Sequence, residues 1–401
     1  MPPLTYEVRQ GLRAEQAVQL LVILAFVARK ERVGARVVGH CSPCTQRLGA
    51  CHPRLFSLAI ELLRFSLAGA LGRVASTRTN GSKRVVTIGG GSGQFVLLSG
   101  LRDVPRLQIT AIVSMVDSGG STGRLRDEMG VLPPGDILKC ILALSPHQEV
   151  TRNLLLSRFQ GNKRLRGHNA GNLLLTALTQ YTGQFPEGVA ALAEILGVTA
   201  SVLPVTIDRA TLVAELTDGS QIFGESAIDV RGDQNQRIRR TYLVPHHSER
   251  VRVYAPVLKA IRAADAIVLG PGDLFTSIVP NLVVPGVARA IARSTAKLIY
   301  NANIMTKYGE TGGFAIEDFV FEIERHIKRP IDVIVANTQR PSRRLLARYE
   351  TERSEFLEIK DSESLRGRRV ILRNLIHDGA EILRHDEVKL AKCLATIFSE
   401  L

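Results

Sequence analysis

The sequence has 401 residues, of which 45% are hydrophobic and 22% are charged, a balance typical of globular proteins and unlike that of disordered or fibrous chains. The formal net charge is +14, but residues 1–84 carry +9 of it and residues 85–401 only +5. The charge therefore does not predict nucleic-acid binding by the larger part. Five cysteines in this length predict no disulfide framework and favour a cytoplasmic protein.

The first 83 residues predict a basic N-terminal extension of uncertain structure, and residues 84–401 predict the main domain. The extension contains two apolar runs, at residues 18–28 and 55–70. The first run is too short for a confident bilayer crossing, and charged residues interrupt the second. We therefore expect two amphipathic or buried helices and no membrane span.

Three of the cysteines, Cys41, Cys44 and Cys51, lie in this extension close to His40 and His52. A zinc knuckle is one interpretation of this cluster. We favour unliganded cysteines, because no second Cys-x-x-Cys pair follows in the sequence, and we predict no metal site.

A glycine-rich turn opens the main domain. Residues 85–88 favour a β-strand, residues 95–101 form an apolar, helix-like run, and between them lie Gly89, Gly90, Gly91, Ser92 and Gly93. The pattern predicts a strand, a tight turn and a helix whose N-terminus faces a phosphate group, with a purely structural turn as the alternative. It is not the standard dinucleotide fingerprint, because the third glycine position falls on Gln94.

A second strand is predicted over residues 107–117. It ends in Asp117, a position where a carboxylate can bind ribose hydroxyls. A loop of small residues with a basic residue behind it follows: Ser118, Gly119, Gly120, Ser121, Thr122 and Arg124. Hydroxyls, backbone amides and a guanidinium together predict a second anion-binding loop, and a flexible surface turn is the alternative.

Two further turns precede predicted helices. Pro134, Gly135 and Asp136 form a rigid turn before a helix at residues 137–144, where Asp136 is either the N-cap or part of a pocket wall. Another helix is expected at residues 148–158.

The second turn contains His168, Asn169 and Asn172 and leads into a helix at residues 173–178. These side chains either cap that helix or contact a ligand.

The middle of the chain predicts a small β-rich insertion. Residues 201–206 read as a short strand, residues 212–216 and 221–223 flank a hairpin turn, and residues 238–244 add another strand. The insertion is too short to predict an independent domain.

A third strand end rich in glycine follows residues 261–269 and contains Gly270, Gly272, Asp273 and Thr276. Asp273 beside a phosphate would be unfavourable without a cation, so it either binds a hydroxyl or caps a helix. A strand at residues 297–303 then delivers Asn303 and Thr306, and residues 331–337 form one more strand.

The alternation of strands and helices predicts an α/β fold, a Rossmann-like three-layer α/β/α arrangement with a mainly parallel sheet. All the glycine-rich strand ends would then meet at the carboxyl edge of that sheet. The C-terminal third predicts a strand at residues 370–372 and a helix at residues 387–398. Tyr349 could stack on a base and Arg384 could bind a phosphate, with a solvated surface as the alternative.

The order of these motifs resembles the CofD/YvcK-like family, and most closely its YvcK-type branch of gluconeogenesis factors. The resemblance covers roughly residues 84–400 and rests on residues 88–93, 117–126, 132–136, 167–175, 218–226, 269–278 and 303–311. Two positions depart from the family pattern. Ser118 stands where the family often has a second acid, and Leu138 stands where an arginine is common.

The resemblance implies a non-catalytic regulator that binds a nucleotide sugar, most simply a UDP-sugar, and links carbon metabolism to cell-envelope synthesis and cell shape. In that role no cofactor is required, NAD is a second candidate ligand, protein partners are unknown and a homodimer is conceivable. The alternative is a CofD-like transferase that moves a phospholactyl-type group from a nucleotide-diphosphate donor to a deazaflavin. Only that alternative would need Mg²⁺.

Overall fold

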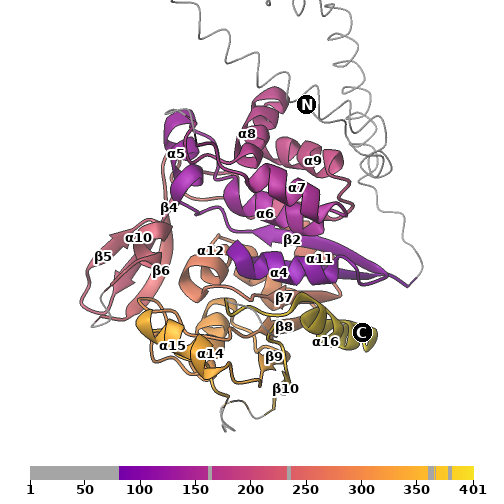
Figure 1. The fold of residues 1–401 in the computed structure, drawn as a ribbon, viewed down its shortest axis with the longest axis vertical. Coiled ribbons are helices and arrows are strands. Elements are labelled where there is room, and N and C mark those ends of the chain that lie inside the picture. The colour runs from indigo at the N-terminus through magenta and orange to yellow at the C-terminus, as the bar shows by residue number, and fades with distance from the viewer. Residues whose placement is uncertain (1–80, 161–164, 233–235, 360–364, 366, 378–381) are drawn as a thin grey trace, which may run out of the picture. The chain divides into compact units, whose positions relative to one another are not determined.

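The computed structural model describes residues 81–401 apart from 161–164, 233–235, 360–364, 366 and 378–381 (Figure 1). Every described residue belongs to the unit Thr79–Leu401. The two apolar runs and the cysteine cluster predicted in the N-terminal extension lie outside the described residues.

A seven-stranded parallel sheet forms the centre of the domain, in the order β10-β9-β8-β7-β1-β2-β3. Its strands are β1 (Lys83–Gly89), β2 (Leu107–Val113), β3 (Ser201–Pro204), β7 (Ala266–Leu269), β8 (Lys297–Asn301), β9 (Val333–Asn337) and β10 (Arg369–Arg373). Strand β1 pairs with β2 on one side and with β7 on the other. This is the strand order of a doubly wound Rossmann-like sheet with one further strand, and it confirms the predicted fold class.

Burial on both faces explains the apolar character of the central strands. In β7 and β9 every residue is buried, and their sequences are AIVL and VIVAN. Parallel strands covered by helices on both faces are nearly continuous apolar runs for this reason. Thr87 in β1 is one of the buried polar residues of these strands, and its hydroxyl accepts a hydrogen bond from the Gln94 side chain at 3.2 Å.

Two groups of helices make the outer layers. One group contains α4 (Gly91–Leu101), α6 (Gly135–Leu144) and α16 (Glu387–Ser399), and the other contains α11 (Ala255–Ala263), α13 (Val287–Arg293) and α14 (Ile316–Ile327). Gly100 lets α16 approach α4 closely, because a Cβ at this position would lie 2.2 Å from the Glu387 carbonyl oxygen. The sheet is thus the middle of three layers.

Further helical segments lie between these elements along the chain. They are α5 (Gly120–Met129), α7 (Gln148–Leu156), α8 (Ala170–Thr182), α9 (Phe185–Ile195), a π-helical turn at Leu274–Ile278, α12 (Val279–Leu282) and α15 (Arg343–Thr351). Among the described residues no single helix is long and apolar enough to cross a membrane, although Leu274–Leu282 with Val287–Arg293 meets the length and composition criteria as a bent pair.

Two boundaries near the second glycine-rich segment differ from the prediction. Strand β2 ends at Val113, four residues before Asp117, because its partners Gly89 in β1 and Pro204 in β3 end at the same level. The predicted loop at residues 118–123 is also partly helical. Gly120 begins α5, and the Gly123 amide donates to the Gly119 carbonyl at 3.0 Å.

Most of the predicted β-rich insertion is a three-stranded antiparallel sheet in the order β5-β4-β6. The strand predicted at residues 201–206 is instead β3, which pairs with β2 in the parallel sheet. The antiparallel sheet consists of β4 (Ala210–Leu216), β5 (Gln221–Phe223) and β6 (Ile238–Pro245), and it lies beside the short helix α10 (Glu225–Asp229) at the left of Figure 1. Helix α10 follows β5 directly and brings two carboxylates, Glu225 and Asp229, toward the ends of the parallel strands.

Candidate functional site

The loops after β1 and β7 meet at the point where the strand order reverses. In open α/β sheets this crevice is the usual place for a ligand. The two loops touch without intervening side chains, because a Cβ on Gly93 would lie 2.2 Å from the Pro271 carbonyl oxygen. Gly91 has φ +64°, a left-handed conformation that favours glycine. The glycines therefore serve both the backbone turn and the close approach of the two loops.

An internal carboxylate already binds part of the helix N-terminus above β1. The Gly91 amide donates to Asp136 Oδ2 at 2.8 Å, and Lys139 Nζ pairs with Asp136 Oδ1 at 2.9 Å. Asp136 is therefore not the N-cap of α6, which begins at Gly135 with Pro134 in the cap position. The amides of Ser92 and Gly93 belong to the same first turn of α4, where no intrahelical acceptor exists.

A cavity of about 500 Å³ opens at these loops. Its wall is formed by the ends of β1, β7 and β8, by residues 229–232 after α10, and by α15 with residues 383–385. The predicted site residues that line it are Gly90, Gly91, Ser92, Gly93, Gly272, Asp273, Asn303, Thr306, Tyr349 and Arg384. The volume lies in the range of small-molecule and cofactor sites.

The other predicted residues lie outside the cavity lining: Gly89, Asp117, Ser118, Gly119, Gly120, Ser121, Thr122, Arg124, Pro134, Gly135, Asp136, His168, Asn169, Asn172, Gly270 and Thr276. Arg124 donates to the Arg166 carbonyl oxygen at 2.7 Å. Asn169 caps α8 by accepting from the Asn172 amide at 2.7 Å. Leu138, at the position where the family often has an arginine, is fully buried in the core.

Three of these residues form a buried polar cluster. Ser121 Oγ lies 3.0 Å from His168 Nδ1, in the turn before α8, and 3.3 Å from Asn172 Nδ2, in the first turn of α8. All three residues are nine-tenths or more buried. The cluster joins α5 to α8 beside the glycine-rich loops, and its position favours a structural role.

We expect Ser121→Ala to lower the free energy of unfolding by about 1–3 kcal/mol, because it leaves buried polar groups without their shared partner. Ligand affinity should change less than about 2-fold, since the cluster does not line the cavity. Chemical denaturation and ligand titration of the same preparation measure the two effects. Ser399→Ala, at an exposed position, is the control. A loss of affinity at unchanged stability would instead assign the cluster to the ligand site.

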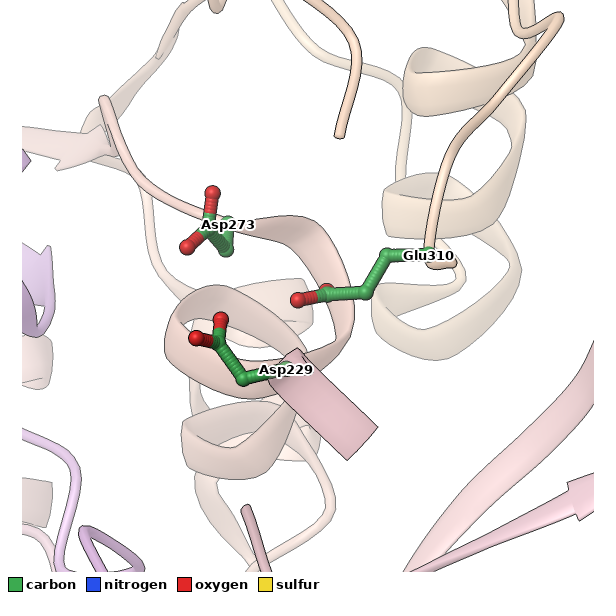
Figure 2. A group of neighbouring side chains, drawn as sticks. All are labelled: Asp229, Asp273 and Glu310. Atoms are coloured by element: carbon green, nitrogen blue, oxygen red, sulfur yellow. The ribbon is translucent and has the colours of Figure 1, made fainter. Parts of the chain in front are cut away.

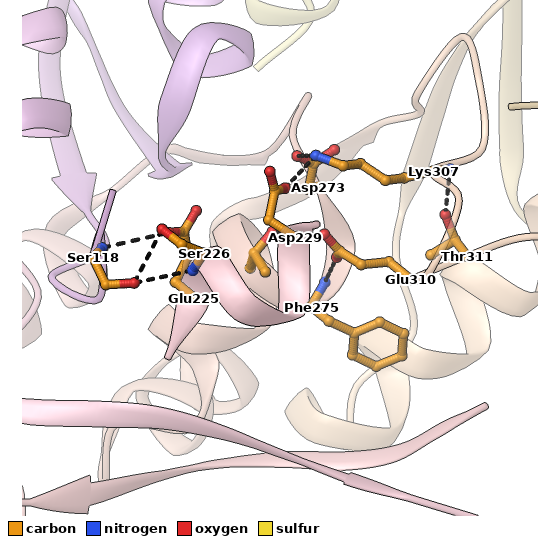
Figure 3. Close-up of polar contacts among 10 residues, drawn as sticks. Ser118, Glu225, Ser226, Asp229, Asp273, Phe275, Lys307, Glu310 and Thr311 are labelled. Atoms are coloured by element: carbon orange, nitrogen blue, oxygen red, sulfur yellow. Dashed lines mark hydrogen bonds and ion pairs between the residues drawn. The ribbon is translucent and has the colours of Figure 1, made fainter. Parts of the chain in front are cut away.

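A second group of acids lies behind the glycine loop. Burial raises the pKa of Asp117, and the neighbouring Asp136 raises it further. Burial likewise raises the pKa of Glu225 to about 7, and the charge of Asp117 adds to the effect. Ser118 joins this group to the insertion, because its hydroxyl accepts from the Ser226 amide at 3.0 Å (Figure 3).

Helix α10 connects that group to the cavity. Its N-terminal end carries Glu225 beside Ser118, and its C-terminal end carries Asp229 into the cavity wall. There Asp229, Asp273 and Glu310 each offer a carboxylate oxygen, and these oxygens lie within 4.8 Å of one another (Figure 2). Three acids from separate segments thus converge beside the strand ends.

Lys307 pairs with two of these acids. Its ammonium contacts Asp229 and lies 3.1 Å from Asp273 Oδ2 (Figure 3). Glu310 instead accepts from the Phe275 amide at 3.1 Å and from the Thr276 hydroxyl at 2.9 Å. Burial raises the pKa of Glu310 to about 8, and the charge of Asp273 contributes. Burial therefore favours the protonated form of Glu310, whereas the neighbouring acids favour the charged form of Lys307.

The prediction from sequence missed several cavity residues, among them Asp229, Lys307 and His385. Lys307 and Glu310 lie inside the motif at residues 303–311, so a search for a cation beside Asp273 could have found Lys307. Asp229 follows a hairpin with no glycine-rich signal. Only the folded position of α10 brings it to the strand ends.

The buried imidazole of His385 belongs to the cavity wall, and its Nε2 has no hydrogen-bond partner among the described residues. Burial lowers its pKa to about 4.

Tyr349 connects α15 to the same wall. Its hydroxyl accepts a hydrogen bond from the Leu383 amide at 2.9 Å. Tyr349 and Arg384 therefore belong to one side of the cavity, whereas the glycine loop belongs to another.

These features define the class of the protein: a Rossmann-like α/β protein with a strand-end cavity between two glycine-rich loops. The sequence model of the family described as 2-phospho-L-lactate transferase CofD matches residues 85–376. The chain belongs to the CofD family.

Its relatives include proteins named gluconeogenesis factors. The putative gluconeogenesis factor of Thermotoga maritima is 40% identical over 319 residues, which cover 78% of this chain and 99% of that protein. The gluconeogenesis factor of Bacillus subtilis is 37% identical over 320 residues, which cover 79% of this chain and 98% of that protein. A UPF0052 family member from Bacillus halodurans has a crystal structure that superposes on this protein with a TM-score of 0.73. The two sequences are 37% identical, and the match covers 78% of this chain and 99% of the other.

Proposed function

We propose that the protein is a cytoplasmic regulator that binds a nucleotide sugar, most simply a UDP-sugar, in the strand-end cavity. The observation that carries the proposal is the position of the cavity: it opens where the strand order reverses, with a glycine loop on one side and polar side chains on the other. The relatives named gluconeogenesis factors support a role in carbon metabolism.

Each wall of the cavity suits one part of such a ligand. The free amides of Ser92 and Gly93, at the positive end of α4, suit the diphosphate. Asn303 and Thr306 offer polar groups from the end of β8, while Tyr349 and Arg384 provide a ring and a guanidinium for the base or the distal phosphate.

The names of the relatives, gluconeogenesis factors, support a regulatory role in this proposal. The described cavity residues offer hydrogen bonds and charges for holding a ligand, and the proposal needs no reaction at the bound sugar. Ligand occupancy would then report the supply of envelope precursors to an unidentified protein partner and so affect cell shape.

Calorimetry of the full-length chain with UDP-N-acetylglucosamine, UDP-glucose, GDP and NAD tests the proposal. We expect micromolar binding of a UDP-sugar, because two or three charge-assisted hydrogen bonds contribute roughly 1.5–3 kcal/mol each. Arg384→Ala should weaken binding by roughly 10-fold or more through the loss of one such contact. Arg343→Ala, on the exposed face of α15, is the matched control. Absence of binding to any UDP-sugar at millimolar concentration would refute the proposal.

A transferase is the second candidate, and membership of the CofD family favours it. Such an enzyme would move a phospholactyl-type group from a nucleotide-diphosphate donor to a deazaflavin with Mg²⁺. Asp117 and Asp136 would be the carboxylates closest to its glycine loop. Turnover of a nucleotide-activated donor that requires Mg²⁺ and disappears in Asp117→Asn would support the transferase over the regulator.

A further inference from the structure

Lys307 occupies a position that calls for a cation. Asp229 comes from the insertion and Asp273 from the loop after β7, and each carboxylate is about a third exposed, toward the cavity that both residues line. Two carboxylates beside a diphosphate site would repel the ligand unless a positive charge separates them from it. Lys307 supplies that charge from within the chain.

The backbone holds Lys307 in this place. Its amide donates to the Thr311 hydroxyl at 2.9 Å, and its carbonyl accepts from the amides of Glu310 at 3.1 Å and Thr311 at 2.8 Å. This closed turn directs Lys307 and Glu310 toward the same acids. Burial opposes the charged ammonium, but the carboxylates outweigh it and raise the pKa of Lys307. Lys307 is therefore a permanent cation at any physiological pH.

The geometry of the three acids is also that of a divalent-cation site. Carboxylate oxygens from Asp229, Asp273 and Glu310 lie within 4.8 Å of one another, and hard divalent cations prefer such oxygen ligands. The ammonium of Lys307 binds two of these acids, and the third is engaged by Phe275 and Thr276. A metal ion and the ammonium would have to compete for Asp229 and Asp273.

We infer that Lys307 is the built-in cation of the ligand site, which takes the place of a divalent metal, so that a nucleotide diphosphate binds without Mg²⁺. This inference rests on the proposed nucleotide-sugar function. It adds that the positive charge that neutralises the diphosphate beside Asp273 is the ammonium of Lys307. The same ammonium excludes a metal ion from the three acids.

The first test measures UDP-N-acetylglucosamine binding by calorimetry with EDTA and with Mg²⁺. For the wild-type chain we expect the same Kd in both, within about 2-fold. Lys307→Met should weaken binding in EDTA by roughly 10-fold or more, because Asp229 and Asp273 then face the diphosphate unneutralised. Lys307→Arg retains the charge and should bind independently of Mg²⁺. Lys259→Met, at an exposed position on α11, is the matched control.

The second test needs no nucleotide. Mn²⁺ titration followed by electron paramagnetic resonance should show a new site in Lys307→Met that binds at least roughly 10-fold more tightly than any site in the wild-type chain. Asp273→Asn in the same variant should remove it. This measurement stands even if Lys307→Met destabilises the protein, because circular dichroism of the sample reports its folding.

The outcomes separate the two proposals. If the wild-type chain binds no UDP-sugar but Lys307→Met gains the Mn²⁺ site, the ligand assignment fails while Lys307 remains the group that excludes a metal. If the wild-type chain binds the UDP-sugar only with Mg²⁺, or binds Mn²⁺ as tightly as Lys307→Met does, the inference about Lys307 is overturned and nucleotide-sugar binding stands.

Discussion

Gly93→Ala is expected to weaken ligand binding and to destabilise the domain. The added Cβ would lie 2.2 Å from the Pro271 carbonyl oxygen and 2.7 Å from its carbon, and both are backbone atoms that cannot rotate away. The loops after β1 and β7 must therefore separate. Overpacking of this kind costs typically about 1–3 kcal/mol. Moving the loop also displaces the amides of Ser92 and Gly93, and the loss of a hydrogen bond to a charged ligand should weaken binding by roughly 10-fold or more.

The matched control for this substitution is Gly232→Ala. Gly232 also lines the cavity, but a Cβ there would meet no heavy atom of the described residues within 4 Å, and its φ is not in the left-handed region. We expect near-normal stability and affinity for the control. Thermal denaturation and calorimetry measure both properties. Equal affinity of Gly93→Ala and Gly232→Ala for a UDP-sugar would show that the contact between the two loops does not shape the ligand site.

Glu310→Gln should make the free energy of unfolding less dependent on pH between about 4.5 and 8. Burial raises the pKa of Glu310 from 4.5 to about 8, so in this window the folded protein keeps a proton that the unfolded chain has lost. The folded state then binds more protons, and stability falls as pH rises, by at most roughly 1.4 kcal/mol per pH unit for one group. Glutamine does not titrate and removes this contribution.

The expected result is therefore a difference between variant and wild type that grows in favour of Glu310→Gln as pH increases toward 8. His385 has the opposite effect, because its pKa of about 4 makes the free energy of unfolding rise with pH up to about 6.5. This effect is present in both proteins and cancels when the wild-type value is subtracted from that of the variant. Urea denaturation at several pH values measures the difference. Glu355→Gln, at an exposed position, should show no such trend. A constant difference across the window would mean that Glu310 is ionised in the folded protein.

Much of the fold follows from the sequence because apolar periodicity is local. The runs that became β1, β7 and β9 are mostly apolar, and this pattern indicates strands buried on both faces of a parallel sheet. The hairpin around Asp218 and Gly219 was predicted from turn chemistry and is confirmed. The end of β2 was placed four residues too late, because its partners and not its own residues decide where pairing stops.

Part of the candidate site was also predictable from local sequence patterns. Glycine-rich strand ends are visible in the sequence, and the loops after β1 and β7 meet as expected at the edge of the sheet. Asp117, Ser121 and His168 belong to equally suggestive motifs, yet they lie behind the cavity lining. The positions of these residues in the sequence show that they follow parallel strands or precede helices. The sequence does not show how far each turn extends toward the ligand.

The sequence by itself determined the α/β class, the family and the glycine loops, since each depends on short-range patterns of residue type. Only the tertiary structure decided which charges meet. Asp229, Asp273 and Lys307 are separated by up to 78 positions in the chain, and Asp136 reaches Gly91 from 45 positions away. Such long-range pairs depend on how the insertion and the loops pack against the sheet. The sequence offers Lys307 as a candidate cation, but its pairing with Asp273 is seen only in the folded protein.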